Sequence, residues 1–454
     1  METCAIILAA SEDDRMRTAD TKVMLAAAGK PVVSWVKKAL DQAGIHDQMY
    51  IVSYRQEKVR EELGESVAFA LQEIPLGTGH AVTQAEPFLY ERKGATVVMA
   101  GDTPLVRAET LSGLIRSFEQ GSWGALVLTA EVEDPAGYGR IVRNDAGDLI
   151  AIVEELESDA KTKKISEVNS GIYCFDTELL YQAMNRIEER EEQDSGRFPL
   201  TDVIDILSRQ GVRVGTLSID PVDFFKIRSR RDLSIASREL NNRVLERIMN
   251  DGVTILDPQT TWVDDDVVIG EDTIILPGCR IHNSCVIGKN CTIGPNTNLS
   301  FTYIGDHSTL TQSEARQASI DKNCQIGPWA NLTDGAEIAE NCVIGSNVDI
   351  NNSRLGADCL IHNQVSLNQA ELGEGVTVGS QVSFAYNEGD LDNRIIVGNH
   401  CFIGSQSCLI APVTLGNNSY VAAGTVVTRD VPKNALAIGR QTPEIKDNWV
   451  LRRR

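Results

Sequence analysis

The fold of the second half of this chain is decided by a stretch that reads Val286-Ile287-Gly288-Lys289-Asn290-Cys291-Thr292-Ile293-Gly294. It holds two pairs of an aliphatic residue and a glycine, six residues apart. The same step of six recurs at residues 373–379, and steps of eighteen, three sixes, occur at 270–288 and 327–345. This period is typical of a parallel β-helix, in which three hexads form one triangular coil and each aliphatic residue points inward. Residues 251–454 are therefore predicted to form a left-handed parallel β-helix of hexapeptide repeats, with the glycines permitting the turns.

The cysteines follow the same repeat. Cys279, Cys285 and Cys291 are six residues apart, and Cys324 and Cys342 are eighteen apart. No pair has CxxC spacing and no nearby histidine completes a zinc set, so the pattern favours structural thiols over disulfides or metal ligands. We expect cysteines at the same phase to stack as a buried column of small residues. Because a coil cannot cover its own sides, we also expect such domains to associate laterally as a homotrimer.

The first half has a different pattern. Residues 1–227 alternate short apolar runs with amphipathic segments, which predicts a doubly wound, Rossmann-like α/β domain with parallel strands and crossover helices. Ligands of such sheets bind beyond the carboxyl ends of the strands. Apolar residues at helical spacing predict one linking helix over 228–250. The candidate strands are Ala5–Ala10, Met49–Ser53, Ala95–Ala100, Ala125–Ala130 and Gly171–Phe175, and candidate helices include Val32–Ala43 and Glu109–Glu119.

Composition excludes several classes of protein. The net charge of −21 argues against nucleic acid as a partner, because phosphate binding needs clustered Lys and Arg. No apolar stretch is long enough to span a bilayer. The first apolar run is too short for a signal peptide and lacks a basic flank. We therefore expect a cytoplasmic protein of ordinary globular composition.

The first domain carries motifs of a nucleotide site and one loop that departs from them. Gln72 precedes Pro75-Leu76-Gly77-Thr78-Gly79-His80-Ala81, and Ala100-Gly101-Asp102-Thr103-Pro104 follows a predicted strand. The loop after the first strand reads Leu8-Ala9-Ala10-Ser11-Glu12-Asp13-Asp14-Arg15-Met16. It has no glycine and carries three consecutive carboxylates, which is unusual for a loop that receives phosphate groups.

Together with the linking helix and the hexapeptide repeat, these motifs resemble the bacterial bifunctional N-acetylglucosamine-1-phosphate uridyltransferase/glucosamine-1-phosphate acetyltransferase (GlmU) family. The similarity covers nearly the whole chain, including the closing run from Arg429 to Arg440. It implies a first domain that makes UDP-N-acetylglucosamine, a cell-wall precursor, from UTP and N-acetylglucosamine 1-phosphate with Mg²⁺. It implies a second domain that transfers an acetyl group from acetyl-coenzyme A to glucosamine 1-phosphate.

The resemblance assigns roles in the first domain residue by residue. Arg15 and Lys22 would neutralise the leaving pyrophosphate as catalytic residues. Asp102 would be catalytic as the magnesium ligand. The positions implied for nucleotide and sugar binding are Leu8, Ala9, Ala10, Gln72, Gly77, Thr78, Gly139, Glu154 and Asn169.

Two departures bear on activity. Two family glycines of the phosphate loop match Ser11 and Asp13, and the family threonine matches Asp14. A carboxylate about 4 Å from a phosphate charge costs roughly 4 kcal/mol at an effective dielectric constant of about 20. The second magnesium ligand of the family, an asparagine, matches Arg228. The metal clamp is therefore reduced to one carboxylate.

The second domain departs further. The histidine that acts as general base in the family matches Asn363, whose amide cannot take a proton. His362 is one residue away, on the opposite side of a strand. The sugar-phosphate ligands of the family match Thr333, Asn351 and Ser366, none of which is cationic. Acetyl-coenzyme A positions are better kept, at Ser405, Ala423 and Arg440, but these positions also serve the repeat itself.

Two readings of function follow. In the first, the chain is an active sugar-1-phosphate uridyltransferase with an inactive acetyltransferase half. In the second, it is a catalytically dead paralogue that binds a sugar nucleotide or acts as a regulatory or scaffold protein. The retained nucleotide and sugar positions support the first reading, and the lost glycines and metal asparagine support the second.

Overall fold

The computed structural model describes residues 1–10, 16–18, 20–54, 57–191, 198–385, 394–439, 443–449 and 451, and of residues 187–191 only the backbone. The chain divides into two compact units, Met1–Leu240 and Asn241–Arg454. The division falls within α8 (Arg230–Asn250), the predicted linking helix, which begins two residues later than expected. Asp232 explains this start, since its carboxylate accepts hydrogen bonds from the Arg228 backbone NH and the Ser229 hydroxyl.

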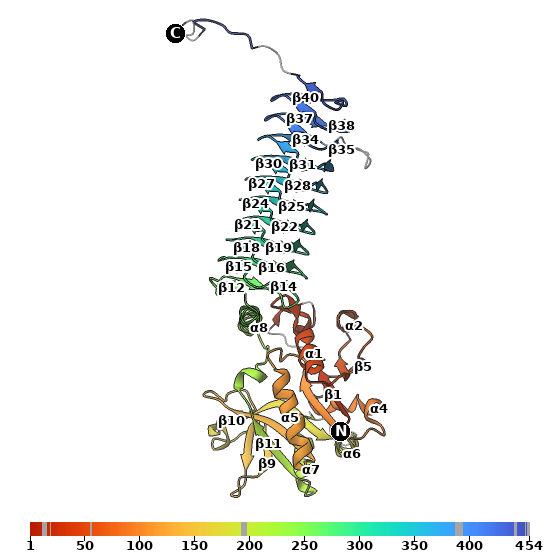
Figure 1. Cartoon of the computed structure of the whole chain (residues 1–454). Helices are drawn as coiled ribbons and strands as arrows, with labels where there is room; N and C mark the ends of the chain where they lie inside the picture. Colours follow the sequence, from red (N-terminus) through yellow and green to blue (C-terminus); the bar gives the residue numbers. More distant parts are fainter. Residues whose placement is uncertain are drawn as a thin grey trace. The chain divides into compact units, whose positions relative to one another are not determined.

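The first unit is built on one mixed sheet in the order β11-β7-β10-β6-β1-β4-β5. Figure 1 labels β1, β5, β10 and β11 of this sheet. Strand β1 lies between β6 and β4 and runs parallel to both. The remaining strands add a short hairpin, β2–β3, and a second hairpin, β8–β9. The strands are β1 (Thr3–Leu8), β2 (Ala26–Ala27), β3 (Lys30–Pro31), β4 (Asp47–Val52), β5 (Ala68–Leu71), β6 (Ala95–Ala100), β7 (Ala125–Glu131), β8 (Arg140–Arg143), β9 (Leu149–Val153), β10 (Glu167–Asp176) and β11 (Val214–Ser218).

The prediction that all central strands are parallel is wrong for β10. The segment Gly171–Phe175 was expected to run parallel to its neighbours, but β10 pairs antiparallel with both β6 and β7. A parallel neighbour needs a crossover connection, usually a helix. The chain between β7 and β10 instead forms the β8–β9 hairpin and a short 3₁₀ turn (Thr162–Lys164), so it returns in the opposite direction.

Helices cover both faces of this sheet, as a doubly wound domain requires. Along β1, Ala5 and Ile7 pack with α1, α2 and α5, whereas Cys4 and Ile6 pack with α3, α4, α6 and α7. The alternation explains why β1 is apolar throughout. The helices are α1 (Val32–Gln42), α2 (Glu57–Leu63), α3 (Thr78–Thr83), α4 (Glu86–Leu89), α5 (Ala108–Gly121), α6 (Thr177–Glu191) and α7 (Thr201–Arg209), with 3₁₀ turns at Lys22–Met24 and Pro221–Phe224.

The second unit is the predicted left-handed β-helix, a stack of parallel coils (Figure 1). Within the described residues each coil contributes strands to three faces, and aliphatic residues such as Ile275 and Ile293 stack inside in register. The first face holds β12 (Thr254–Ile255), β15 (Ile274–Ile275), β18 (Thr292–Ile293), β21 (Thr309–Leu310), β24 (Gln325–Ile326), β27 (Val343–Ile344), β30 (Leu360–Ile361), β33 (Thr377–Val378), β36 (Phe402–Ile403), β39 (Tyr420–Val421) and β41 (Leu436–Ala437).

The other two faces follow the same order along the stack. The second face holds β13 (Trp262–Val263), β16 (Arg280–His282), β19 (Asn298–Ser300), β22 (Glu314–Arg316), β25 (Asn331–Thr333), β28 (Asp349–Asn351), β31 (Ser366–Asn368), β34 (Ser383–Ala385), β37 (Cys408–Ile410) and β40 (Val426–Val427). The third face holds β14 (Val268–Ile269), β17 (Val286–Ile287), β20 (Tyr303–Ile304), β23 (Ser319–Ile320), β26 (Glu337–Ile338), β29 (Arg354–Leu355), β32 (Ala370–Leu372), β35 (Ile395–Val397) and β38 (Val413–Leu415).

The expected role of the repeat glycines needs correction. Gly288 was expected to permit a turn, but it does not have a positive φ; a Cβ at Gly288 would instead lie 2.7 Å from the Asp306 backbone nitrogen. The glycine is therefore needed for close approach of the next coil. Many of the left-handed turn residues are not glycines, for example the asparagines Asn290 (φ 56°) and Asn323 (φ 60°), and asparagine is one of the residue types that adopt this conformation most readily.

The cysteine column is confirmed for one set of cysteines. Five buried cysteines immediately precede strands of the first face, and those before β24, β27 and β30 lie in adjacent coils. Cys279 and Cys285 precede strands of the second and third faces, so they do not stack on Cys291. Burial raises the pKa of Cys279 and Cys285, which keeps both thiols protonated near neutral pH. The five are Cys291, Cys324, Cys342, Cys359 and Cys401.

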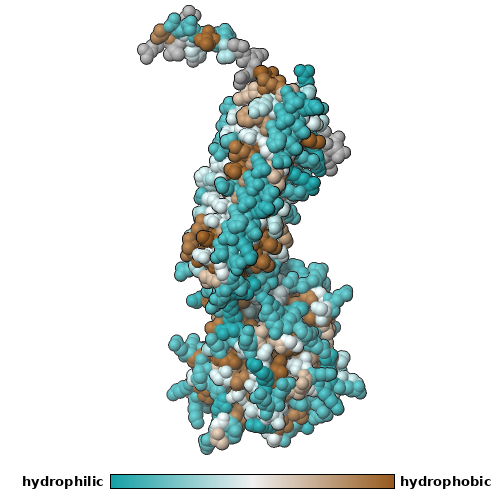
Figure 2. Space-filling view, in the orientation of Figure 1, coloured by the Kyte–Doolittle hydropathy of each residue, from teal (hydrophilic) through white to brown (hydrophobic). Residues whose placement is uncertain are grey.

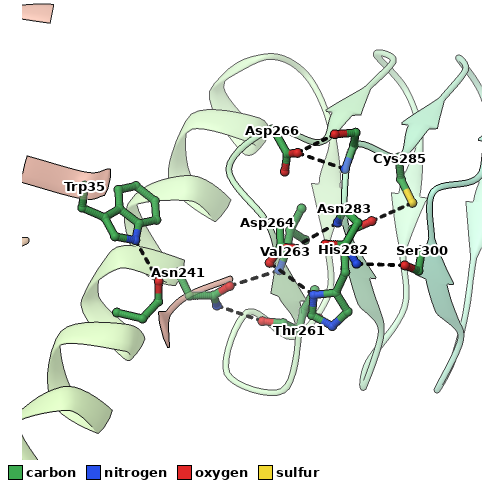
Figure 3. Close-up of polar contacts among 12 residues, drawn as sticks. Trp35, Asn241, Thr261, Val263, Asp264, Asp266, His282, Asn283, Cys285 and Ser300 are labelled. Carbon is green, nitrogen blue, oxygen red and sulfur yellow. Dashed lines mark hydrogen bonds and ion pairs between the residues drawn. The ribbon is translucent and has the colours of Figure 1, made fainter. Parts of the chain in front are cut away.

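The first coils of the β-helix are held by buried and half-buried polar side chains (Figure 3). The Asn241 amide of α8 donates to the Thr261 carbonyl at 2.9 Å and accepts from the Val263 NH at 3.1 Å. The Asp264 carboxylate lies 3.2 Å from His282 Nδ1 and accepts from the Asn283 NH. The two Asn241 bonds satisfy backbone groups of the first coil, which has no preceding coil to bond, and the Asp264 bonds join the first coil to the second.

The surface carries separate apolar patches on a mostly hydrophilic face (Figure 2). On the β-helix, Val268, Val286 and Tyr303 occupy register-matched positions of β14, β17 and β20 and are 61%, 42% and 50% exposed. They form one outward-facing apolar line. In the described part of the chain, none of the helices combines the length and apolarity that a membrane crossing requires.

Candidate active site

The carboxyl ends of the central strands of the first unit gather most of the predicted site residues. Beyond β1, the Ala9 NH donates to the Ile51 carbonyl at 2.8 Å, and the Gly101 NH donates to the Leu8 carbonyl at 2.9 Å. A Cβ at Gly101 would lie 3.3 Å from the Ala9 Cβ. The start of the Leu8–Ala10 loop is therefore packed tightly against the Asp102 segment. The remainder of the acidic loop, Ser11 to Asp14, and the predicted catalytic Arg15 lie outside the described residues.

Asp102 and Lys22 form a buried ion pair at this edge. Lys22 Nζ lies 2.6 Å from Asp102 Oδ2, and the two side chains are 8% and 9% exposed. Asp102 Oδ1 is also buried and has no hydrogen-bond partner among the described residues. A buried acceptor without a donor is costly, and such atoms often mark a position for an ion or water. The two residues that the resemblance assigned to separate phosphate and metal roles thus contact each other directly.

Asp102 can offer a magnesium ion one carboxylate oxygen, but the described residues around it provide few other ligands. Mg²⁺ is commonly held by one or two carboxylates together with substrate phosphates, and Asp102 Oδ1 offers one such oxygen. The described residues contain no cluster of three or more His, Cys, Asp or Glu that could hold a metal by itself. Arg228 stands at the position of the family asparagine, and its guanidinium has no lone pair to offer a metal ion. A metal here would therefore depend on the substrate for most of its ligands.

The residues predicted to bind the nucleotide are brought together by a distant loop. The Gln72 amide nitrogen lies 3.2 Å from the Gly77 carbonyl oxygen and 2.9 Å from His80 Nδ1. Thr78 Oγ1 accepts from the Leu200 NH at 2.8 Å. Gly77 has φ 128°, and a Cβ there would lie 2.5 Å from the Phe198 carbonyl oxygen. Phe198 was not anticipated, because its contribution is a backbone carbonyl that no side-chain motif reveals.

The residues predicted to bind the sugar converge where β8 meets β10. The Asn169 NH donates to the Gly139 carbonyl at 2.8 Å, and the Asn169 amide donates to the Tyr173 hydroxyl at 2.7 Å. The register of β10 shifts between Asn169 and Tyr173, which is a bulge of the kind found beside functional sites. Glu154 accepts from Thr201 Oγ1 at 3.3 Å. The three predicted sugar positions thus lie on neighbouring strands and loops.

Asn363 and His362 lie on a corner of the β-helix, beyond the end of β30, and both are exposed. The expectation that a strand directs their side chains to opposite sides is therefore wrong, because neither residue belongs to a strand. Asn363 Oδ1 accepts from the Ser346 NH at 2.9 Å, directly beyond Gly345 of the preceding coil. Asp306, Asn399 and Asn417 make the same kind of bond in other coils, at the corner that follows the third face. The residue at the family's base position therefore follows the rule of the repeat.

The positions expected for the sugar phosphate of the acetyl acceptor bond to each other. The Asn351 amide donates to Thr333 Oγ1 at 3.0 Å and to Asp334 Oδ2 at 2.5 Å. Ser366 lies on the next strand of the same face and is exposed. Where the family has cations, this surface presents an amide that is already engaged and a carboxylate, which would repel a phosphate.

The acetyl-coenzyme A positions also take part in stacking. Ser405 Oγ accepts from the Ser380 NH at 3.1 Å, and the Ala423 backbone lies against Gly404 of the preceding coil. Ser405 and Ala423 therefore occupy neighbouring coils at one corner, whereas Arg440 lies outside the described residues. The geometry explains these two residues without a cofactor.

Comparison with known families agrees with this organisation. A model of the nucleotidyl transferase family matches residues 5–216. A model of bacterial transferase hexapeptides (six repeats) matches residues 266–301 and 317–351, and a hexapeptide repeat of succinyl-transferase matches residues 394–429. Fold and site thus define a nucleotidyltransferase-type unit followed by a hexapeptide transferase-type unit.

Curated relatives extend over the whole chain. The bifunctional protein GlmU of Acetivibrio thermocellus is 38% identical over 99% of this chain and 97% of its own length. The proteins of the same name from Brevibacillus brevis and Geobacillus thermodenitrificans are 37% and 38% identical, over 96% and 99% of this chain and 95% and 98% of their own lengths. The chain belongs to the bifunctional GlmU family.

One solved structure is a more distant match. A putative glucose-1-phosphate thymidylyltransferase from Bacillus anthracis, in complex with a sucrose, has a TM-score of 0.44 and 22% sequence identity to this chain. It covers 52% of this chain and 94% of its own length. This likeness is too weak to support an argument about function.

Proposed function

We propose that the first unit is a sugar-1-phosphate uridyltransferase that joins UTP and N-acetylglucosamine 1-phosphate into UDP-N-acetylglucosamine. The main support for this proposal is the buried Asp102 carboxylate, because its Oδ1 has no hydrogen-bond partner among the described residues. It lies at the strand edge near which the positions for the nucleotide and the sugar gather. Family membership and the nucleotidyl transferase match support the same assignment.

In the proposed reaction, an oxygen of the sugar phosphate attacks the α-phosphorus of UTP. A P–O bond forms there, the bond to the β-phosphate breaks, and pyrophosphate leaves with the electron pair. Lys22 would hold negative charge on the phosphates, and the Gln72–Thr78 segment and Asn169 would orient the base and the sugar. Mg²⁺, held by Asp102 and the phosphates, would supply charge neutralisation when bound.

We further propose that the second unit does not transfer acetyl groups. Asn363 cannot accept a proton from an amine, and Asn351 and Thr333 bond each other where a phosphate would need cations. Acetyl-coenzyme A is accordingly not proposed as a cofactor of this chain. The second unit would serve assembly, since the apolar line Val268–Val286–Tyr303 offers a surface for lateral contact in a homotrimer. Light scattering would then give three times the chain mass.

The ion pair also favours a second candidate function. Lys22 already neutralises Asp102, and a metal must displace or share that partner. A chain that binds the sugar nucleotide without turnover, as a regulatory or scaffold protein, is the function that remains if the metal does not enter. Either function concerns nucleotides and sugar phosphates, so we propose a cytoplasmic protein.

Pyrophosphate release separates the two candidates. Purified protein is incubated with UTP, N-acetylglucosamine 1-phosphate and Mg²⁺, and binding of UDP-N-acetylglucosamine is measured by calorimetry in parallel. Release that depends on both substrates supports the uridyltransferase. Binding of the product without release rejects it in favour of the binding protein, and the absence of both signals rejects both.

A further inference from the structure

The segment Lys226-Ile227-Arg228 puts two cations beside the candidate sugar site, and neither the nucleotide motifs nor the family resemblance gives them a role. Ile227 anchors the segment: its NH donates to the Asp102 carbonyl at 3.0 Å, and its side chain is fully buried. The residues on either side of Ile227 are half-buried. The segment is thus fixed to the same residue that carries the candidate metal carboxylate.

The two cationic side chains reach neighbouring loops of the sugar site. Lys226 Nζ lies 3.0 Å from the position that a Cβ on Gly171 would occupy. Arg228 Nη1 lies 3.3 Å from the corresponding position on Gly137, and its guanidinium carbon lies 5.3 Å from the centre of the Tyr138 ring. Gly171 follows Asn169 by two residues and Gly137 precedes Gly139 by two. Both cations therefore flank the junction between Asn169 and Gly139, which share a hydrogen bond of 2.8 Å.

The described carboxylates near this pair are engaged with other groups. Glu155, which accepts from the Gly137 NH at 3.3 Å, is bound by Arg140 Nη2 at 2.7 Å. That bond holds the pKa of Glu155 below its usual value, so the carboxylate is committed to Arg140. Asp232 accepts from the Arg228 backbone NH, and Asp102 is paired with Lys22. Among the described residues, neither Lys226 nor the Arg228 guanidinium has an ion-pair partner, and Tyr138 orients the guanidinium through its ring face.

We propose that Lys226 and Arg228 form an anion subsite that binds the phosphate of the sugar 1-phosphate directly, without a metal ion. The inference rests on the proposed function, because it takes the sugar 1-phosphate as the ligand. A planar guanidinium can bind two phosphate oxygens at once, and the lysine adds a second donor. In the family, the asparagine at this position would hold a metal ion that supplies positive charge. In this chain, the Arg228 guanidinium would supply that charge itself.

The test is equilibrium binding of N-acetylglucosamine 1-phosphate in EDTA, measured by calorimetry on the full chain. Arg228→Asn should weaken this binding by about 10- to 100-fold, the value of a hydrogen bond to a charged group. Binding of neutral N-acetylglucosamine should stay unchanged. The matched control is Arg231→Asn, an exposed arginine three residues along, which should bind like the parent chain.

Two further variants keep the test decisive. Arg228→Lys preserves the charge but not the planar fork, and should fall between the parent and Arg228→Asn. Lys226→Gln should weaken metal-free binding in the same direction. Equal or tighter binding by Arg228→Asn in EDTA would overturn the proposal, since it would mean that the guanidinium blocks the site or does not reach it.

Failure of the subsite and failure of the reaction give different results. If the parent chain releases pyrophosphate but its metal-free binding is insensitive to both substitutions, only the subsite is wrong. If it releases none but binds the sugar 1-phosphate in an Arg228-dependent way, the subsite stands and the proposed reaction is wrong. If the parent chain does not bind the sugar 1-phosphate in EDTA, the subsite is rejected whatever the turnover.

Discussion

The two units differ in what holds the residues that match site positions of the family. In the first unit, Gln72, Asp102 and Asn169 converge from separate strands and are held by contacts specific to that place, such as the Ile227 NH on the Asp102 carbonyl. In the β-helix, the side chains of Asn363 and Ser405 each accept a backbone NH of the preceding coil, as side chains at another corner also do. In a repeat, the side chain at such a position can serve the stacking of coils alone, whereas the edge of a non-repetitive sheet offers no such general structural use.

A residue that matches the family indicates catalysis only where folding does not already explain its presence. A residue that satisfies a repeat rule is explained by folding alone, so its presence says little about catalysis. Asp102 has no such explanation, because its buried Oδ1 lacks a donor among the described residues and adds a cost to folding. The first unit is therefore where substitutions should affect turnover, and the second unit is where they should affect only stability.

The largest expected effect is that of Asp102→Ala on pyrophosphate release. Loss of the metal carboxylate should remove several kcal/mol of charge stabilisation, or roughly a 10³-fold reduction in rate. The matched control is Asp145→Ala, an exposed aspartate in the β8–β9 turn, which should leave the rate unchanged. Turnover that survives Asp102→Ala would contradict the inference that the first unit keeps this carboxylate for catalysis.

The buried ion pair gives the next effect, on stability. Lys22→Met should leave Asp102 as an uncompensated buried charge and lower the free energy of unfolding of the first unit by roughly 3–5 kcal/mol. Lys58→Met is the control, because Lys58 also lies 2.6 Å from a carboxylate, that of Asp20, but in an exposed pair worth about 1 kcal/mol or less. Calorimetry compares the first unit's transition in the two variants, and equal shifts would show that burial of the pair has no energetic weight.

A smaller effect is expected from Gly77→Ala. Both φ 128° and the close Phe198 carbonyl oppose a Cβ, so the substitution should displace the loop and weaken UTP binding by about tenfold or more. Gly147→Ala separates the two causes, since Gly147 has φ 87° but no atom within 4 Å of the position that a Cβ would occupy. It should leave UTP binding unchanged in the same calorimetric titration. Similar losses in both variants would mean that backbone strain alone, and not the loop contact, explains the result.

Much of the architecture could be predicted because its causes are local. The hexapeptide period fixes which side chains face inward, and the structure confirms this in pairs such as Ile275 and Ile293. The direction of β10 could not be predicted from its own residues, because it depends on whether the preceding connection forms a helix or a hairpin. The role of Gly288 was misjudged for a similar reason, since the limiting contact comes from Asp306 in the next coil.

The candidate site was predictable only where a motif marked it. Asp102 and Gln72 stand in short recognisable runs. The structure places Asp102 beyond the end of β6 as expected, whereas β5, the strand that Gln72 follows, was not predicted. Their partners were not predictable, because the Lys22–Asp102 pair joins residues 80 positions apart. Lys226 carries no motif at all, and only its distance from Gly171 reveals it as a neighbour of the sugar site.

The substitution Asn363→His tests whether residue 363 of the β-helix has only a structural role. Restoring a histidine should give no acetyl transfer to glucosamine 1-phosphate, because Thr333 and Asn351 still supply no cation for the phosphate. It should instead lower the free energy of unfolding by about 1 kcal/mol, since the imidazole replaces the amide oxygen that accepts from the Ser346 NH.

Asn399→His is the matched control for Asn363→His. Asn399 accepts from the Glu374 NH in the same way and does not match a site residue of the family. Equal losses in melting experiments would confirm that residue 363 has become an ordinary member of the repeat. Acetyl transfer by Asn363→His alone would show that the second unit has kept a working acceptor site and lacks only its base.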